Sequence, residues 1–92
     1  MPRISAFQGI VIYMYWNEGD HLVAHFLAHC AGARASVAVD GRILAGTLDP
    51  RALRLAQGWA RLHRDEMEAN WERARRSEPL LPIEPLPSGW SP

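Results

Sequence analysis

Three histidines at one repeating interval are the residues whose types and spacing best suit chemistry. His21, His25 and His29 lie four residues apart in the segment GDHLVAHFLAHC, and Glu18 and Asp20 stand just before or beside them. Residues four apart share a face on a helix, and residues at any even separation share a face on a strand. Either geometry therefore lines the three imidazoles, the histidine row, along one surface.

The histidine row suits three kinds of role. A metal site needs three or four ligands at about 2.0–2.3 Å, which Cys30 or the two acids would complete only on a helical or strongly bent segment. On a regular strand, residues four apart are about 13 Å distant, and the zinc spacings CxxC and HExxH are absent. An imidazole can also act as a general acid–base or contact a phosphate, because it titrates near neutrality. The plainest interpretation is partly exposed histidines with hydrogen-bonded rings.

The composition describes one small globular domain. The chain has 92 residues, of which 48% are hydrophobic and 22% are charged, which is ordinary for globular proteins. A chain of this size buries only about 60–65% of its unfolded surface, so it has room for a stabilising partner or for self-association. Its ten basic and ten acidic residues cancel, so the net charge does not support nucleic-acid binding, although a local basic patch remains allowed.

The sequence predicts a cytoplasmic protein without a membrane partner. Cys30 is the single cysteine and cannot form an intramolecular disulfide. Residues 1–15 carry no basic leader, and the apolar residues 10–16 are too few to cross a bilayer. No motif in the chain requires a cofactor.

An antiparallel sheet of four to five strands is predicted over residues 4–47. The clearest strand covers residues 10–16, which are rich in β-branched and aromatic side chains. Asp40-Gly41 is a strong hairpin signal between residues 33–39 and 42–47. The segment 22–30 fits either a helix or a strand on its pattern alone. For the aromatics Tyr13, Tyr15 and Trp16, a place in the core is favoured over a platform for stacked bases.

A helix is predicted over residues 50–76, packed against the sheet in an α+β fold. Asp49 suits the N-cap and Pro50 the first helical position. The apolar stripe indicates one long helix, or two helices that meet at a kink near His63. We expect one core built from Leu55, Trp59, Leu62, Met67 and Trp71 against Ile10, Ile12, Val37 and Val39.

The opposite face of this helix is charged, and the chain beyond it is rich in proline. The basic residues Arg51, Arg54, Arg61 and Arg64 precede Asp65, Glu66, Glu68 and Glu72. A solvated face with ion pairs is favoured here over a track for phosphates. From Ser77 onward the prolines require an extended chain. We expect a single domain over residues 1–86 and a flexible tail over residues 87–92.

Dispersed motifs resemble a family of short bacterial proteins, the domain of unknown function 4160. The matching residues are 2–5 with Phe7, then 9–15, Asp20-His21, His25-Phe26, Arg51-Ala52-Leu53, Trp59, Leu62-His63, Glu66, Asn70-Trp71, Ala74, Glu78-Pro79-Leu80 and 83–86. The resemblance covers residues 2–86. The family's pattern has two prolines where this chain has Val23 and Ala24, and a further histidine where it has Leu27. Those prolines favour a strand over residues 24–30. The resemblance also implies products of small paired genes, suspected of belonging to toxin–antitoxin-like modules.

We therefore expect a protein-binding component of a toxin–antitoxin-like or regulatory gene pair. Its partner would be a small protein from a neighbouring gene, or a second copy, docking on the sheet edge or the histidine surface. The expected ligand- or partner-binding residues are Tyr15, Asp20, His21 and His25, with no metal ligand and no catalytic residue assigned. Two alternatives stay open: a small ribonuclease-like toxin using His21 or His25 with a nearby arginine, and a metal-binding domain.

Overall fold

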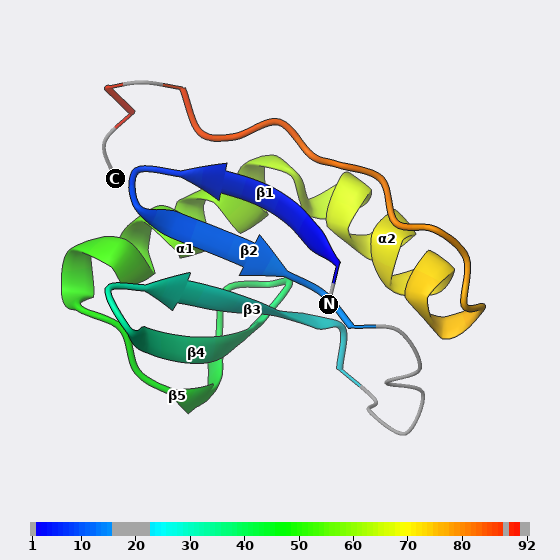
Figure 1. The fold of residues 1–92 in the computed structure, drawn as a ribbon, viewed down its shortest axis with the longest axis horizontal. Helices are drawn as coiled ribbons and strands as arrows, with labels where there is room; N and C mark the ends of the chain where they lie inside the picture. Colours follow the sequence, from blue (N-terminus) through cyan, green and yellow to red (C-terminus); the bar gives the residue numbers. More distant parts are fainter. Residues whose placement is uncertain (1, 16–22, 88, 91–92) are drawn as a thin grey trace.

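The chain forms an antiparallel sheet with helices against one of its faces, as the computed structural model shows (Figure 1). The structure describes residues 2–15, 23–87 and 89–90. Its five strands lie in the order in which they occur in the sequence. The elements are β1 (Arg3–Phe7), β2 (Ile10–Tyr13), β3 (His25–Cys30), β4 (Ala33–Ala38), β5 (Ile43–Gly46), α1 (Pro50–Leu62) and α2 (Arg64–Arg75). The predicted antiparallel sheet and α+β class are confirmed, and no helix within the described ranges is long and apolar enough to span a membrane.

Two tight turns place the first four strands. Gln8 and Gly9 join β1 to β2 with φ angles of 48° and 80°, and Ala31 and Gly32 join β3 to β4 with φ angles of 52° and 81°. Two consecutive residues at positive φ define the turn whose twist matches that of the flanking strands. Each strand therefore pairs directly with its neighbour in sequence, and the sheet is a meander.

The ambiguous segment after the first hairpin is a strand. In β3, Phe26 and Ala28 are buried, whereas Leu27 and His29 between them are only half-buried. The strand pairs with β2 and β4, with Ile12 opposite Ala28 and Phe26 opposite Val37. Residues 25–30 are a strand because they form backbone hydrogen bonds to β2 and to β4. The spacing of side chains within the segment carries no information about these partners. The strand favoured by the family resemblance is thus found over residues 25–30.

The predicted single helix over residues 50–76, long or kinked, is wrong, because α1 and α2 are separate helices. The alternative of two helices that meet near His63 is the one found. His63 lies between them with φ −115° and ψ 30°, outside the helical region, and its backbone N–H still donates to the Trp59 carbonyl. A straight helix of the predicted length would extend about 40 Å at 1.5 Å per residue, whereas the longest extent of the molecule is 34 Å. The break at His63 gives α2 a direction different from that of α1 (Figure 1), and Met67 and Trp71 of α2 are buried. The start of α1 is as predicted, with Asp49 accepting from the N–H groups of Arg51 and Ala52.

The core lies between the sheet and the two helices and is centred on Trp59. The indole has no exposed surface and packs against the rings of Phe7 and Phe26 at centroid distances of 5.6 and 5.8 Å. The residues predicted to form the core between helix and sheet are buried with one exception. Leu62, at the last turn of α1, is 57% exposed, because the chain leaves the helix at the next residue. Tyr13 and Tyr15, for which a core position was also favoured, are only half-buried.

The proline-rich chain after α2 runs back along the sheet beside β1 (Figure 1). The N–H of Ile83 donates to the Ile4 carbonyl at 2.8 Å, and Trp59 Nε1 donates to the Glu84 carbonyl at 2.8 Å. Ile83 and Leu86 are buried. This segment therefore covers the outer edge of β1 and closes the core, while the predicted flexibility of residues 87–92 stays a prediction.

Gly58 in the middle of α1 is explained by the indole of Trp90 lying against it. A Cβ added at Gly58 would lie 2.8 Å from Cζ2 of Trp90 and closer still to Cη2. Glycine inside a helix costs about 1 kcal/mol relative to alanine. The absence of a side chain here is what allows a residue near the end of the chain to pack on the helix backbone.

We expect Gly58→Ala to release Trp90 without stabilising the protein. The gain in helix propensity, about 1 kcal/mol, is offset by the lost contact between the helix and the indole. In a Trp90→Ala background the overlap is gone, so Gly58→Ala should raise the free energy of unfolding by about 1 kcal/mol. Urea denaturation of the four variants of this cycle measures both effects. Equal effects of Gly58→Ala in the two backgrounds would show that Trp90 does not pack there in solution.

Candidate functional site

The sheet face turned away from the helices carries half-buried side chains. By strand alternation it includes Val11 and Tyr13 of β2, and Leu27 and His29 of β3, which pair as Val11 with His29 and Tyr13 with Leu27. The His29 ring meets the Tyr13 ring edge-on at a centroid distance of 4.8 Å. His29 Nε2 is buried and has no hydrogen-bond partner among the described residues. His29 thus belongs to a small aromatic cluster on this outer face.

His25 occupies a different environment at the start of β3. Its Nδ1 lies 3.0 Å from the Val23 carbonyl, and its ring packs on that of Trp71 in α2 at 5.0 Å. Because a carbonyl only accepts, Nδ1 carries the proton in this contact. Tyr15, also half-buried, follows β2 at the same end of the sheet. His25 is therefore anchored by the backbone and by α2, unlike His29.

The histidine row does not act as one set within the described structure. His25 and His29 share a strand and are separated by about 13 Å at 3.3 Å per residue. Over residues 2–15, 23–87 and 89–90, no three histidine, cysteine, aspartate or glutamate side chains group to hold a metal ion. His21 and Asp20 lie outside the described residues, so a site formed by them with His25 and Tyr15 stays a prediction, as does the ribonuclease-like alternative.

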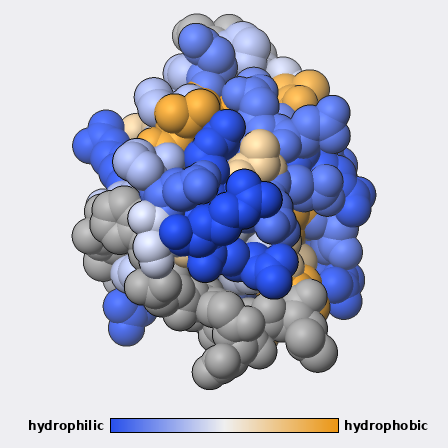
Figure 2. All heavy atoms as spheres, turned by 90° about the vertical axis from the view of Figure 1, so that its right-hand side faces the viewer, coloured by the Kyte–Doolittle hydropathy of each residue, from blue (hydrophilic) through white to orange (hydrophobic). Residues whose placement is uncertain are grey.

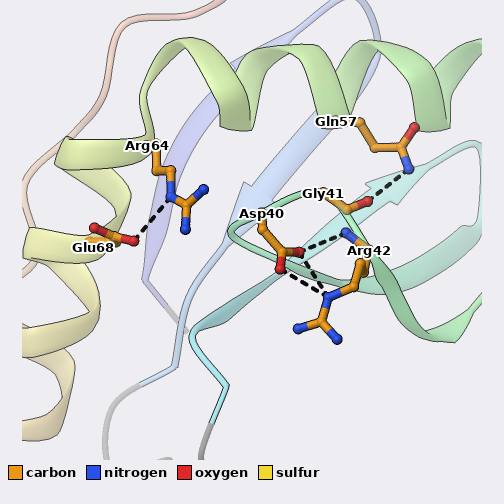
Figure 3. A network of polar contacts seen from close by, with 6 residues as sticks. All are labelled: Asp40, Gly41, Arg42, Gln57, Arg64 and Glu68. Atoms are coloured by element: carbon orange, nitrogen blue, oxygen red, sulfur yellow. Dashed lines mark hydrogen bonds and ion pairs between the residues drawn. The ribbon is translucent and has the colours of Figure 1, made fainter.

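An ion pair within the turn between β4 and β5, the Asp40–Arg42 clasp, shapes this turn, and a separate hydrogen bond joins the turn to α1 (Figure 3). Asp40 Oδ1 accepts from the backbone N–H of Arg42 at 3.1 Å, and Arg42 Nε donates to both carboxylate oxygens. From the helix, Gln57 Nε2 donates to the Gly41 carbonyl at 2.8 Å. The backbone N–H of Arg42 above all, together with the Arg42 guanidinium and the charge of Arg64, holds the pKa of Asp40 below its usual value. The turn predicted from Asp40-Gly41 is thus tied directly to α1.

We expect the clasp to loosen in acid. Since the pKa of Asp40 is lower in the folded protein than in the unfolded chain, its stabilising effect is complete above the unfolded value and is lost as pH falls through the folded one. An NMR titration should show the Arg42 amide shifting with a midpoint below the usual range for aspartate. Asp40→Asn should abolish this titration and leave the rest of the spectrum in place. A midpoint at or above the usual value would contradict the clasp.

The end of the molecule formed by α2 is predominantly hydrophilic (Figure 2). Two of its three arginines are ion-paired: Arg64 Nε lies 3.1 Å from Glu68, and Arg75 Nη1 lies 3.0 Å from Glu72. Exposed pairs of this kind contribute little to stability. The predicted ion-paired face is therefore found on α2, whereas Arg54 and Arg61 of α1 have no such partner among the described residues.

Among the described residues, two of the four exposed large hydrophobic side chains lie next to each other on β5. All four residues of this strand are exposed, and Ile43 and Leu44 are 47% and 43% exposed. β5 is the last strand of the sheet, and at the opposite edge β1 is covered by the segment around Ile83. The two edge strands of the sheet therefore differ: β1 is covered by the segment around Ile83, whereas β5 carries exposed apolar side chains.

Sequence reasoning missed Ile43 and Leu44 as surface residues. The hairpin signal at Asp40-Gly41 predicted a strand over residues 42–47, but not its position at the edge of the sheet, where its side chains are exposed. Ile43 and Leu44 are adjacent in a short strand, so their side chains point to opposite faces of the sheet. This adjacency was the sequence signal that could have indicated exposure of at least one of them.

Comparison with known proteins identifies the shared region but no activity. A family model described as a domain of unknown function (DUF4160) matches residues 9–72. This range runs from the first turn through α2 to Glu72, and so contains the histidine row, the open edge and α1. Searches of curated proteins and of solved structures give no significant match. The resemblance noted over residues 2–86 is confirmed over residues 9–72.

Proposed function

We propose that this chain, which belongs to the family described as a domain of unknown function (DUF4160), is a protein-binding domain that docks a small partner through β5. In this proposal it is one component of a toxin–antitoxin-like or regulatory gene pair. The observation that carries the proposal is the exposure of Ile43 and Leu44 on an open edge strand.

An uncovered edge strand can bind a partner strand through its backbone hydrogen bonds, and these bonds also fix how the two strands align. The outward N–H and C=O groups of an edge strand are a template for another strand, and natural proteins usually cover or charge such edges. Here β1 is covered in that way by the chain itself, through the hydrogen bond from Ile83 to Ile4. β5 contains no charged residue in its sequence ILAG. An extended partner segment added beside β5 would satisfy its backbone and cover its apolar side chains, the mode known as β-augmentation.

The occupant we propose is an extended segment of the neighbouring gene's product. The histidine surface, with Tyr15, Asp20, His21 and His25, is proposed as a second contact region for the same partner. Of these, the structure describes His25 and Tyr15 at the end of the sheet where β3 begins. Binding is expected to be dominated by the apolar edge, because few buried residues carry most of the energy of an interface.

The test is calorimetric titration of the neighbouring gene's product into wild type and variants. Ile43→Lys/Leu44→Lys should weaken binding about tenfold or more, each factor of ten being 1.4 kcal/mol. The control is Leu81→Lys, because Leu81 is 51% exposed but lies in the segment after α2. It should change affinity by less than about twofold. Circular dichroism confirms that each variant is folded.

Three outcomes contradict the proposal. Undiminished binding by the double variant would remove β5 from the interface, and failure of the wild-type chain to bind the neighbouring product would remove the partner. A homodimer in sedimentation that dissociates in the double variant would assign the edge to a second copy instead.

A further inference from the structure

From the geometry of α1 we infer a second binding site, which takes an acidic–hydrophobic segment of a protein partner. The site, the α1 groove, is a hollow of about 600 Å³ lined by Arg54, Gln57, Gly58, Arg61, Leu62 and Trp90. It involves no residue of β5, so it goes beyond the proposed edge docking and is tested separately. A hollow of this size, mostly apolar with a few polar groups, is typical of a binding site.

The apolar part of the α1 groove is built by Leu62 and by Trp90, whose partly buried ring also packs against the core. Leu62 is 57% exposed, and Trp90 is half-buried against Gly58. Because α1 ends at Leu62 and the chain turns at His63, α2 does not cover this side chain. The groove therefore presents an indole and an isobutyl group side by side with helix backbone.

The charged part is two arginines, Arg54 and Arg61, that have no acidic partner in the described part of the chain. α1 has three arginines and no acidic residue in its sequence PRALRLAQGWARL. Arg51 donates to Gln8 Oε1 at 3.0 Å. Arg54 and Arg61 make no ion pair among the described residues, whereas Arg64 and Arg75 of α2 do. The Arg61 guanidinium lies over Gly41, where a Cβ would be 3.4 Å from Nη2. Unpaired guanidinium groups in a partly apolar hollow are suited to bind carboxylates in a bidentate manner.

Charge and shape favour a protein segment over a nucleic acid. Arg54 and Arg61 are two helical turns apart, about 10 Å along the axis, and Asp65 and Glu66 line the adjacent hollow beyond Leu62. A polyanion that continued past Arg61 would meet these carboxylates, whereas a short segment with one or two acids would not. Tryptophan and arginine are also the residue types most enriched at the energetic centres of protein interfaces.

Selection from a phage-displayed peptide library on the immobilised full-length protein tests this inference without a known partner. We expect selected peptides to combine aspartate or glutamate with an aromatic or aliphatic residue. The affinity of the best synthetic peptide should fall about 30-fold or more in Arg54→Glu/Arg61→Glu, because both charge-assisted contacts become repulsive. Leu62→Ala should reduce it about fivefold.

The matched control is Arg51→Glu, which reverses a charge on the same helix outside the groove. Arg51→Glu should change the affinity for the selected peptide by less than about twofold when both proteins are measured at the same ionic strength, about 0.15 M, where long-range charge effects are screened. Three results would overturn the inference: no enriched peptide, enriched peptides without acidic residues, or equal binding by the Arg54→Glu/Arg61→Glu variant. Arginine-dependent binding of a fluorescent oligouridylate in preference to the selected peptides would assign the groove to nucleic acid and overturn it as well. Thermal melting of each variant shows that the fold is retained.

Discussion

Trp59→Ala is expected to lower the free energy of unfolding by about 3–5 kcal/mol, the cost of truncating a large aromatic side chain in a core. Trp59 has no exposed surface and touches both Phe7 and Phe26. It also donates a hydrogen bond to the Glu84 carbonyl, so the variant loses one attachment of the returning segment. A domain of this size has a total stability of about 5–15 kcal/mol. The variant should therefore be largely unfolded at physiological temperature if the wild type lies at the low end of that range.

The two contributions can be separated with Trp59→Phe. Phenylalanine keeps much of the ring contact with Phe7 and Phe26 but cannot donate to Glu84, so we expect a smaller loss of about 1–2 kcal/mol. Urea denaturation followed by far-ultraviolet circular dichroism measures both variants. A loss below about 1 kcal/mol in Trp59→Ala would show that the core repacks around this position.

The sequence predicts those parts of the fold that rest on short-range signals. Asp49 and Pro50 define a helix start through their own hydrogen-bonding and φ preferences, and Asp49 caps α1 as expected. The hairpin at Asp40-Gly41 is present for the same reason, because its residues suit the backbone of a turn. These signals need no knowledge of what lies across the core.

The break between α1 and α2 depends on long-range geometry instead. Neither glycine nor proline stands at His63, and the apolar stripe continues on both sides of it. What ends α1 is the limited length of the core on which it packs, and this becomes known only when the sheet is assembled. Leu62 was assigned to the core for that reason, although it becomes an exposed wall of the α1 groove.

The candidate surfaces show the same division between local and long-range information. If residues 25–30 form a strand, the spacing of His25 and His29 puts both on the same face. It does not predict that the His25 ring contacts Trp71 or that the His29 ring contacts Tyr13. Exposure of Ile43 and Leu44 follows from strand order, which puts β5 at an edge. The place of Trp90 on Gly58 follows from the path of the proline-rich segment. The spacing of residues along the sequence predicts neither the order of the strands in the sheet nor the path of the segment after α2.

Asn70→Ala is expected to lower the free energy of unfolding by about 2 kcal/mol, because one side chain holds the returning segment by two hydrogen bonds. Asn70 is 1% exposed. Its Nδ2 donates to the Leu81 carbonyl at 2.8 Å, and its Oδ1 accepts from the Leu81 N–H at 3.0 Å. The amide thus pairs with the Leu81 backbone as a neighbouring strand would. The matched control is Arg73→Ala, which removes only the second hydrogen bond to Oδ1, from Arg73 Nη1 at 3.0 Å, and should cost less than about 1 kcal/mol.

Loss of this attachment should also be visible at the covered edge of the sheet. Leu81 and Ile83 are two residues apart, and the Ile83 N–H covers β1 by donating to Ile4. Hydrogen exchange at the Ile83 amide should therefore become faster in Asn70→Ala than in Arg73→Ala, relative to amides of β3. With β1 uncovered, the sheet would have two open edges, and we expect concentration-dependent aggregation of Asn70→Ala in light scattering. Unchanged protection of Ile83 would mean that burial of Ile83 and Leu86, rather than Asn70, holds the segment against the sheet.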